Sequence, residues 1–235
     1  MARISDPTVR RLSSYYRVLL DVSAEGGRVI SSHRLAEREA VTSAQVRKDL
    51  SMFGSFGRRG LGYPVDPLRR EIQGILGLDR RWRVALIGAG NIGAALLSYQ
   101  GFVRQGFDFA AAFDRDPARI GQPFGDLTVR DISELAAAAA AAVERFDMAV
   151  IATPARAAQE VADAVIAAGV RGILNFAPRK LQVPEHVALR NVDMSVELES
   201  LSFELTRARA PRRRRSRALA RAPRARRRAS ACFAW

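Results

Sequence analysis

The pattern of hydrophobic and polar positions changes near residue 80. Before that point, apolar side chains recur at helical spacing within short segments, and after it they form short continuous runs. The first segment with helical spacing is 8–22, where Val9, Leu12, Tyr16, Leu19 and Leu20 fall near one face. This spacing predicts an amphipathic helix at the N-terminus.

Polar residues that cap helices mark two more helices in this N-terminal part. Ser31 and Ser32 can cap a short helix, because a serine hydroxyl accepts a hydrogen bond from a free backbone N–H of the first turn. The segment 41–43, Val-Thr-Ser, predicts a turn and a cap before a third helix at 44–53.

A glycine-rich segment follows the third helix. Four glycines between residues 54 and 62 predict a strand–turn–strand hairpin that ends at Tyr63. A further helix is expected with Asp66 as its cap, Pro67 as its first residue and its end at Gly77. Three helices followed by a basic hairpin are the order of a winged helix-turn-helix, a DNA-binding module, which we assign to residues 1–80.

From Trp82 onward, short apolar strands alternate with helices. Strands are expected at 84–87, at a segment that ends at Phe113–Asp114, at 148–152 and at 172–175; helices are expected to begin near Asn91 and at Pro154, and the alanine run 136–142 to form a crossover helix. Continuously apolar strands are typical of a parallel sheet covered on both faces. The sequence therefore predicts an α/β fold with a doubly wound parallel sheet of the Rossmann type over residues 81–192.

One amphipathic segment remains at the end of this region. Met194, Leu198, Leu201 and Leu205 place one apolar stripe on a predicted helix over 193–206. An isolated amphipathic helix must bury such a stripe, so we expect it to mediate dimerisation. Residues 207–235 are rich in Arg, Ala and Pro, and a tail of this composition is expected to be disordered.

The charge is distributed unevenly along the chain. The formal net charge is +14, but 12 arginines and no acidic residue lie from Arg207 onward, which leaves residues 1–206 with +2. Binding of nucleic acid by the folded part therefore needs a local basic patch. No apolar run is long enough to span a bilayer, the N-terminus lacks the apolar core of a signal peptide, and Cys232 is the single cysteine. These features predict a cytoplasmic protein without a membrane partner, an intramolecular disulfide or a cysteine metal site.

The segment Gly88-Ala89-Gly90-Asn91-Ile92-Gly93 follows a predicted strand directly and opens a helix. Asp114 lies 21 residues after the last glycine, at the end of the second strand. This context predicts a dinucleotide site, because the glycines let the backbone approach a pyrophosphate and the carboxylate can accept hydrogen bonds from the adenosine ribose. Asp114 favours NAD(H) over NADP(H), and the neighbouring Arg115 leaves that preference open.

Residues suited to catalysis are scarce near this motif. A dehydrogenase needs a proton donor or acceptor beside the nicotinamide. His33 lies in the helical N-terminal part, His186 in a predicted loop, and Tyr99 and Lys180 are the remaining candidates. There is no Tyr-x-x-x-Lys pair, nucleophile elbow or metal-ligand cluster. We therefore expect a sensor and not an enzyme; the alternatives are an NAD-dependent oxidoreductase of a small metabolite and a CoA- or nucleotide-binding module.

The third predicted helix carries Gln45, Arg47 and Lys48 within one turn, where a recognition helix would enter a major groove. Arginine and lysine can donate to guanine and glutamine can pair with adenine, but the cations can equally hold phosphates. Arg58 and Arg59 fall at the tip of the predicted hairpin, where a wing can reach the DNA backbone or the minor groove.

Several motifs resemble the Rex family of redox-sensing repressors over residues 7–205, in the same order. They are Ser31-Ser32, Gln45-Val46-Arg47-Lys48-Asp49-Leu50-Ser51, Phe53-Gly54, Phe56-Gly57, Arg59-Gly60-Leu61-Gly62-Tyr63, the glycine motif 88–93, Phe113-Asp114-Arg115-Asp116-Pro117, Asn175-Phe176-Ala177-Pro178 and Asn191-Val192-Asp193. The resemblance implies a homodimer whose last helix swaps into the partner. It also implies that the dimer binds a palindromic double-stranded operator when free or bound to NAD⁺, and that NADH releases it.

Sensing the redox state requires residues near the nicotinamide, where the two cofactor forms differ in charge and ring planarity. The candidates for this end of the cofactor are Tyr99, Thr153, Pro154, Asn175 and Phe176. Ser31 and Ser32 join the three helix residues and the two hairpin arginines as candidate DNA contacts.

Overall fold

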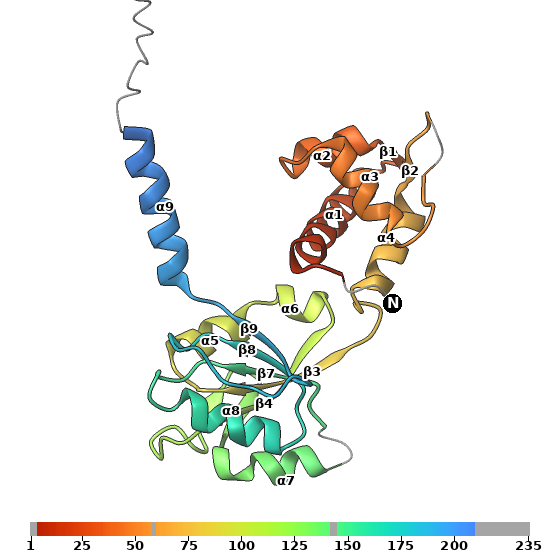
Figure 1. Cartoon of the computed structure of the whole chain (residues 1–235). Coiled ribbons are helices and arrows are strands. Elements are labelled where there is room, and N and C mark those ends of the chain that lie inside the picture. Colours follow the sequence, from red (N-terminus) through yellow and green to blue (C-terminus); the bar gives the residue numbers. More distant parts are fainter. Residues whose placement is uncertain (1–3, 58–59, 142–144, 210–235) are drawn as a thin grey trace, which may run out of the picture. The chain divides into compact units, whose positions relative to one another are not determined.

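The computed structural model describes residues 4–57, 60–141 and 145–209 (Figure 1). The chain divides after Val192 into two units. The first contains the N-terminal domain, which holds helices α1 to α4, and the sheet domain, which holds strands β3 to β9. The second contains helix α9 (Met194–Arg209) and is described by itself.

The four helices of the N-terminal domain are α1 (Asp6–Ala24), α2 (Ser32–Arg38), α3 (Ser43–Ser51) and α4 (Val65–Ile75). Their shared core includes Leu12, Leu19, Leu35 and Ile72, all with 0% exposure. Burying an aliphatic side chain of this size contributes about 1.5–3 kcal/mol, so this core can hold the helices together. The predicted helical order is confirmed.

The buried face of α1 differs from the predicted stripe. Tyr15 is fully buried and Tyr16 only partly, while Val9 and Leu20 are each 39% exposed. A hydrogen bond accounts for the difference: the buried Tyr15 hydroxyl donates to the Asp49 carboxylate of α3 at 3.0 Å. The helix is therefore rotated toward Tyr15.

Both predicted caps are confirmed. The Ser31 hydroxyl accepts a hydrogen bond from the Arg34 N–H, and the Thr42 hydroxyl accepts one from the Gln45 N–H, each at 3.1 Å. Between the two helices the chain turns at Ala40, whose φ of 51° lies in the left-handed region. The caps and this turn set the start of α3.

Replacing Ala40 by glycine is expected to stabilise the protein by about 0.5–1 kcal/mol. Ala40 is exposed and loses no packing, and glycine avoids the roughly 1–2 kcal/mol cost of a left-handed residue, part of which is offset by its more flexible unfolded state. Urea unfolding measures the change. Ala137→Gly, at an exposed position inside helix α7 (Leu135–Ala140), should instead destabilise by about 1 kcal/mol. Equal destabilisation by both would contradict the prediction.

The glycine-rich segment does not form the predicted hairpin. Strand β2 (Tyr63–Pro64) pairs antiparallel with β1 (Val29–Ile30), and residues 54–57 form no strand. The close approach of this segment to β1 explains why residue 62 is a glycine. Its φ is +86°, and a Cβ there would lie 2.6 Å from the Ile30 carbonyl oxygen. This glycine serves the pairing with β1, and Arg58 and Arg59 lie outside the described residues.

Two predicted helix starts were also wrong. Helix α4 begins at Val65, and Asp66 lies in its first turn, where its carboxylate accepts a hydrogen bond from the Ser23 hydroxyl. Helix α8 (Ala158–Ala167) begins four residues after Pro154, because the intervening residues form a tight turn closed by the Ala157 N–H and the Pro154 carbonyl.

The sheet domain is a seven-stranded sheet in the order β5-β6-β4-β3-β7-β8-β9. Its strands are β3 (Trp82–Ile87), β4 (Phe107–Asp114), β5 (Pro123–Phe124), β6 (Leu127–Asp131), β7 (Met148–Ile151), β8 (Gly172–Asn175) and β9 (Ala188–Asn191). All pair in parallel except β5, which pairs antiparallel with β6. Without β5 this is the Rossmann order, in which the direction of winding reverses between β3 and β7. The predicted doubly wound sheet is confirmed.

Helices cover both faces of the sheet. α7 and α8 lie on one face, and α5 (Asn91–Ser98) and α6 (Gly101–Arg104) lie on the other (Figure 1). Alternate residues of β3 serve the two cores: Ala85 and Ile87 face the first, Val84 and Leu86 the second. The reversal of winding leaves an opening at the carboxyl ends of β3 and β7, where ligands bind in sheets of this type.

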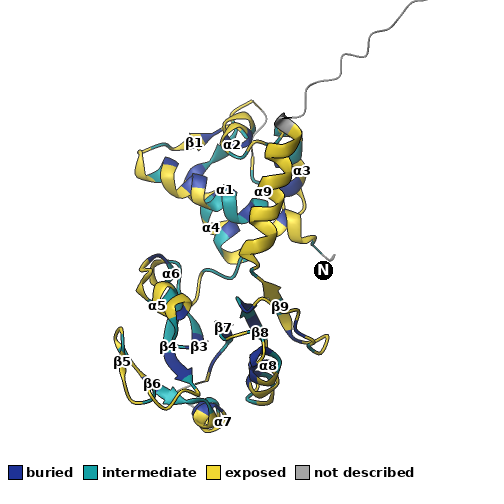
Figure 2. Cartoon of the chain, turned by 90° about the vertical axis from the view of Figure 1, so that its left-hand side faces the viewer, coloured by how far each residue is buried: buried dark blue, intermediate teal, exposed yellow. Residues whose placement is uncertain are grey.

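Helix α9 extends the predicted helix by three residues, from 206 to 209. Its apolar side chains are exposed (Figure 2): Met194, Val196, Leu198, Leu201, Phe203 and Leu205 are each more than half accessible. The rest of the predicted tail, 210–235, lies outside the described residues. None of the described helices is both long and apolar enough to cross a membrane.

Candidate functional site

The glycine turn after β3 is built by close backbone contacts. Gly88 has a φ of +109°, and a Cβ there would lie 2.5 Å from the Ala152 carbonyl oxygen after β7. A Cβ on Gly93 would collide with the Gly88 carbonyl oxygen. These two glycines are therefore required by the fold itself.

Gly90 differs from its two neighbours in the motif. Its φ of −83° suits any residue, and a Cβ would meet only the Arg119 guanidinium, at 3.2 Å. Gly90 is also the N-cap of α5, and because glycine has no side chain it cannot cap the N–H groups of the first turn. The N–H groups of that turn have no partner within the helix and carry the positive end of the helix dipole, which suits a phosphate.

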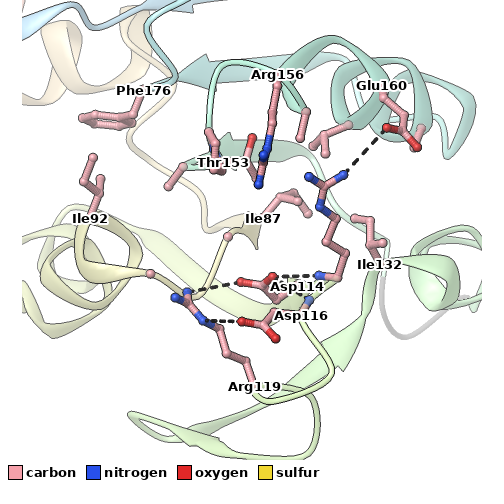
Figure 3. A pocket seen from close by; sticks show the side chains of 18 of the residues that line it. Ile87, Ile92, Asp114, Asp116, Arg119, Ile132, Thr153, Arg156, Glu160 and Phe176 are labelled. Atoms are coloured by element: carbon pink, nitrogen blue, oxygen red, sulfur yellow. Dashed lines mark hydrogen bonds and ion pairs between the residues drawn. The ribbon is translucent and has the colours of Figure 1, made fainter.

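Asp114 ends β4 and anchors two loops. Its Oδ2 accepts a hydrogen bond from the Ala89 N–H at 2.8 Å, and its Oδ1 accepts bonds from the N–H groups of Arg115 and Asp116 at 2.7 and 3.0 Å. The Arg119 guanidinium lies 3.5 Å from Oδ2 and 3.4 Å from the Asp116 carboxylate (Figure 3). The carboxylate thus ties the glycine turn to the loop after β4.

A cavity of about 1010 Å³ opens at this edge of the sheet (Figure 3). It is lined by residues that follow the carboxyl ends of five parallel strands, including Gly88 after β3, Asp114 of β4, Ile132 after β6, Thr153 after β7 and Phe176 after β8. Its volume lies at the upper end of the range of small-molecule sites, large enough for an extended ligand.

Eight of the twelve predicted cofactor residues line this cavity. They are Gly88, Gly90, Asn91, Ile92, Asp114, Thr153, Pro154 and Phe176. The buried Thr153 Oγ1 has no hydrogen-bond partner within the described part of the chain. A buried hydroxyl without a partner is costly, so a ligand that bonds to it would gain.

The other four predicted cofactor residues do not line the cavity. The Ala89 N–H bonds to Asp114, and Gly93 packs against the glycine turn. Tyr99 is 55% exposed at the end of α5, with its ring edge-on to Phe102 at 5.0 Å. The fully buried Asn175 bonds to Ala177, Arg179 and Asn191, so it shapes the loop that carries Phe176.

Several lining residues were missed from the sequence. Arg119, Ile132, Ser133, Arg156 and Glu160 all line the cavity. Arg119 follows the acidic strand end by five residues, in the turn after β4, and this nearness in the sequence to Asp114 was a usable signal. The others follow β6 or β7 along the chain: Ile132 and Ser133 lie in a short 3-10 helix, Arg156 in the turn after β7 and Glu160 in the first turn of α8. Only the folded sheet brings these segments together. Neither His33 nor His186 is among the lining residues.

The second candidate site is the helix pair α2–α3. Two of the predicted contact residues on it form hydrogen bonds within the domain. The Gln45 side-chain N–H donates to the Asp49 carboxylate at 2.8 Å, and the Arg47 guanidinium donates to the Ser32 hydroxyl at 3.1 Å. Lys48 is exposed. Burial raises the pKa of the Tyr63 hydroxyl on β2, and the nearby Arg47 opposes that rise. Arg47 therefore links α3 to α2 through Ser32 and acts electrostatically on Tyr63 of β2.

A buried carboxylate fixes α3 against α1. Asp49 is 1% exposed, and its oxygens accept hydrogen bonds from the Arg11 guanidinium at 2.6 and 2.7 Å, from Tyr15 and from Gln45. Burial alone would raise the pKa of this carboxyl, but these bonds outweigh it and hold the pKa below its usual value. The charge of Asp49 is thus part of the fold.

Comparison with known sequences supports the two sites separately. The profile of a family described as "Putative DNA-binding protein N-terminus" matches residues 3–51, and that of a family described as "CoA binding domain" matches residues 79–179. A redox-sensing transcriptional repressor Rex from Chloroflexus aurantiacus is 46% identical over 202 residues, which cover 86% of this chain and 94% of the relative. The Rex protein of Desulfitobacterium hafniense is 47% identical over 208 residues, which cover 88% and 98%.

Solved structures also match this chain over most of its length. The complex of RSP, a Rex-family repressor, with β-NAD⁺ and operator DNA superposes on this chain with a TM-score of 0.83 at 36% identity, covering 88% of this chain and 95% of RSP. RSP in complex with β-NADH gives a TM-score of 0.79 at 34% identity, covering 88% and 97%.

Proposed function

Since this chain belongs to the Rex family of redox-sensing transcriptional repressors, we propose that it binds a palindromic operator as a homodimer and leaves that DNA when NADH occupies its cavity. Transcription of its target genes would then follow the ratio of NADH to NAD⁺. The observation that carries the proposal is the presence within one chain of a helix-turn-helix and of a large cavity lined by the glycine turn and Asp114.

The two ends of the cavity suit the two ends of the cofactor. Asp114 lies where the adenosine ribose sits in Rossmann folds, and the start of α5 suits the pyrophosphate. The opposite end carries Ile92, Thr153 and Phe176, which we assign to the nicotinamide (Figure 3). Selective release by NADH requires that this end bind the two redox forms with different affinity, and by linkage DNA must discriminate between them equally.

The remaining site assignments are part of the proposal. Gln45, Arg47 and Lys48 on α3 are assigned to the operator, together with Ser31 and Ser32 at the start of α2 and with Arg58 and Arg59. We keep the domain boundaries at residues 80 and 192, assign the protein to the cytoplasm, where its DNA target lies, and propose that the cofactor is sensed and not turned over. Steady NADH oxidation with a small metabolite, without DNA binding, would favour the oxidoreductase alternative.

We assign dimerisation to α9. Its exposed apolar residues cannot be left in water at no cost, and a swapped second copy of the chain would cover them. Leu198→Asp with Leu201→Asp is expected to convert the dimer to a monomer and to weaken operator binding at least about 10-fold, since two half-sites would no longer be bound together. Sedimentation velocity gives the mass. Glu199→Ala on the same helix is the control, and a dimer that survives the double substitution would remove α9 from the interface.

An operator-binding titration tests the proposed function. Palindromic duplexes are first selected from random-sequence DNA with the full chain, and their affinity is then measured by fluorescence anisotropy without cofactor, with NAD⁺ and with NADH. We expect NADH to lower the affinity at least about 10-fold and NAD⁺ to leave it nearly unchanged, which corresponds to a coupling of about 1.4 kcal/mol. Equal affinity in saturating NAD⁺ and NADH would refute redox sensing.

A further inference from the structure

One ion pair joins the N-terminal domain to the sheet domain. The Arg190 guanidinium on β9 donates a hydrogen bond to the carboxylate of Asp6, the first residue of α1, at 2.6 Å. Among the ion pairs between described side chains, it is the one that links the two domains. The other side-chain hydrogen bond that crosses residue 80 within the described ranges joins Trp82 to the Gly77 carbonyl in the linker itself.

On the sheet side, this pair lies next to a contact that reaches the cofactor cavity. Arg190 is followed on β9 by Asn191, whose side-chain oxygen accepts a hydrogen bond from the Asn175 amide at 2.9 Å. The Val192 N–H donates to the Asn175 carbonyl at 2.8 Å. Asn175 is fully buried and its side chain also bonds to the loop that carries Phe176, at the end of the cavity assigned to the nicotinamide. The end of β9 is therefore fixed to that loop.

On the other side, the pair holds the start of the helix that positions α3. Asp6 opens α1, and Arg11 and Tyr15 on the same helix both bond to the Asp49 carboxylate of α3. Asp49 in turn accepts the Gln45 side-chain N–H, on the surface assigned to the operator. Because these buried bonds tie the two helices together, a shift of α1 carries α3 with it.

The pair is weak enough to form in one arrangement of the domains and to break in another. Its two side chains are 61% and 60% exposed, and an exposed ion pair contributes little to stability. A ligand shifts a two-state equilibrium only by its difference in affinity for the two states, so a strong lock between the domains would resist NADH. A weak and specific contact suits a protein that has to change its domain arrangement.

We propose that Arg190 and Asp6 are positioning residues for redox sensing, and that their ion pair passes the effect of NADH from the Phe176 loop through β9 to α1 and the recognition helix. The inference deepens the proposed function and rests on it. Neither residue lines the cavity or lies on α2 or α3. Loss of the pair should therefore leave cofactor binding and DNA binding in place and weaken the coupling between them.

The coupling ratio tests this inference. It is the operator affinity of the full chain without cofactor divided by its affinity in saturating NADH, measured by fluorescence anisotropy on one selected duplex. We expect a ratio of at least about 10 for the unsubstituted protein and below about 3 for Arg190→Ala and for Asp6→Ala, with NADH affinity in the absence of DNA changed less than about 2-fold. Arg171→Ala removes the same charge from an exposed position of the sheet domain outside the cavity and should keep the full ratio.

Exchange of the two charges separates the ion pair from a general effect of the substitutions. The double variant Asp6→Arg with Arg190→Asp restores a pair of opposite charges at the same place, so it should recover most of the coupling ratio. A loss in the single variants that the exchanged pair does not recover would show that the ion pair is not its cause. Thermal unfolding checks that each variant is folded, and the exposed pair predicts little change there.

The outcomes distinguish this inference from the proposed function. A full coupling ratio in both single variants, or an equal loss in Arg171→Ala, would overturn the inference and leave NADH sensing intact. A ratio of about 1 in the unsubstituted protein would instead refute redox sensing itself, and the inference with it.

Discussion

An Asp49→Ala variant is expected to lose about 3 kcal/mol of stability in the N-terminal domain. Removing one partner of a buried ion pair is costly because the groups left behind have lost their acceptor. Here the Tyr15 hydroxyl, on a fully buried side chain, would have no partner, and the Arg11 guanidinium, whose side chain is 24% exposed, would recover only part of its hydration. Urea unfolding at pH 7 measures the loss. Glu25→Ala removes an exposed carboxylate from the same domain and should cost less than about 1 kcal/mol.

The pH dependence of this loss identifies the charge as its cause. The folded-state pKa of Asp49 lies below its usual value, so its stabilisation is fully present above the unfolded pKa of about 3.9 and is lost as pH falls through the lower folded pKa. The stability gap between the unsubstituted protein and Asp49→Ala should therefore narrow below about pH 4. A gap that stayed constant down to the acid unfolding transition would assign the effect to packing and not to ionisation.

The same variant should affect DNA binding beyond its effect on folding. Asp49 accepts the Gln45 side-chain N–H at 2.8 Å and thereby fixes the amide on the exposed surface of α3. At a temperature where the variant is still folded, its operator affinity should fall further than that of Glu25→Ala. Unchanged affinity in the folded variant would show that the position of Gln45 does not matter for the operator.

The comparison of Asp49 with the glycine motif shows what could be predicted from the sequence. The strand, the glycine turn and the caps at Ser31 and Thr42 depend on neighbours within a few residues, so their pattern is visible along the chain. The role of Asp49 depends on Arg11, 38 residues away, and on Tyr15, 34 residues away. The sequence therefore predicted a recognition helix and gave no sign of the buried carboxylate that holds it.

The errors have the same physical origin. The N-terminal hairpin was predicted from glycine spacing, but Gly62 serves a contact with Ile30, 32 residues earlier. Tyr16 fits the helical stripe as well as Tyr15, and the difference is made by Asp49 on another helix. The cavity lining has the same explanation. Asp114 was found from its spacing to the glycines, whereas Ile132 and Arg156 come from segments after β6 and β7 that only the sheet order brings near it.

Gly90→Val is expected to fold normally but to bind NADH at least about 100-fold more weakly. Gly90 has an ordinary φ of −83°, and an added side chain would meet only the flexible Arg119 guanidinium, so the fold does not require a glycine there. It would, however, occupy the space in which the pyrophosphate approaches the backbone at the start of α5. Under the proposed function, this variant would remain on its operator in the presence of NADH.

Alanine variants of two other glycines, Gly93 and Gly74, serve as controls for Gly90→Val. Gly93→Ala places a Cβ against the Gly88 carbonyl oxygen, which is backbone and cannot yield, so that variant should unfold at a much lower temperature. Gly74→Ala adds a methyl group inside α4 with nothing within 4 Å and should stabilise the protein by about 1 kcal/mol. Thermal unfolding followed by circular dichroism, together with titration of NADH fluorescence, separates the three cases. A pyrophosphate bound at the start of α5 would collide with a valine side chain at position 90. Wild-type NADH affinity in Gly90→Val would therefore mean that the pyrophosphate does not pass over this glycine.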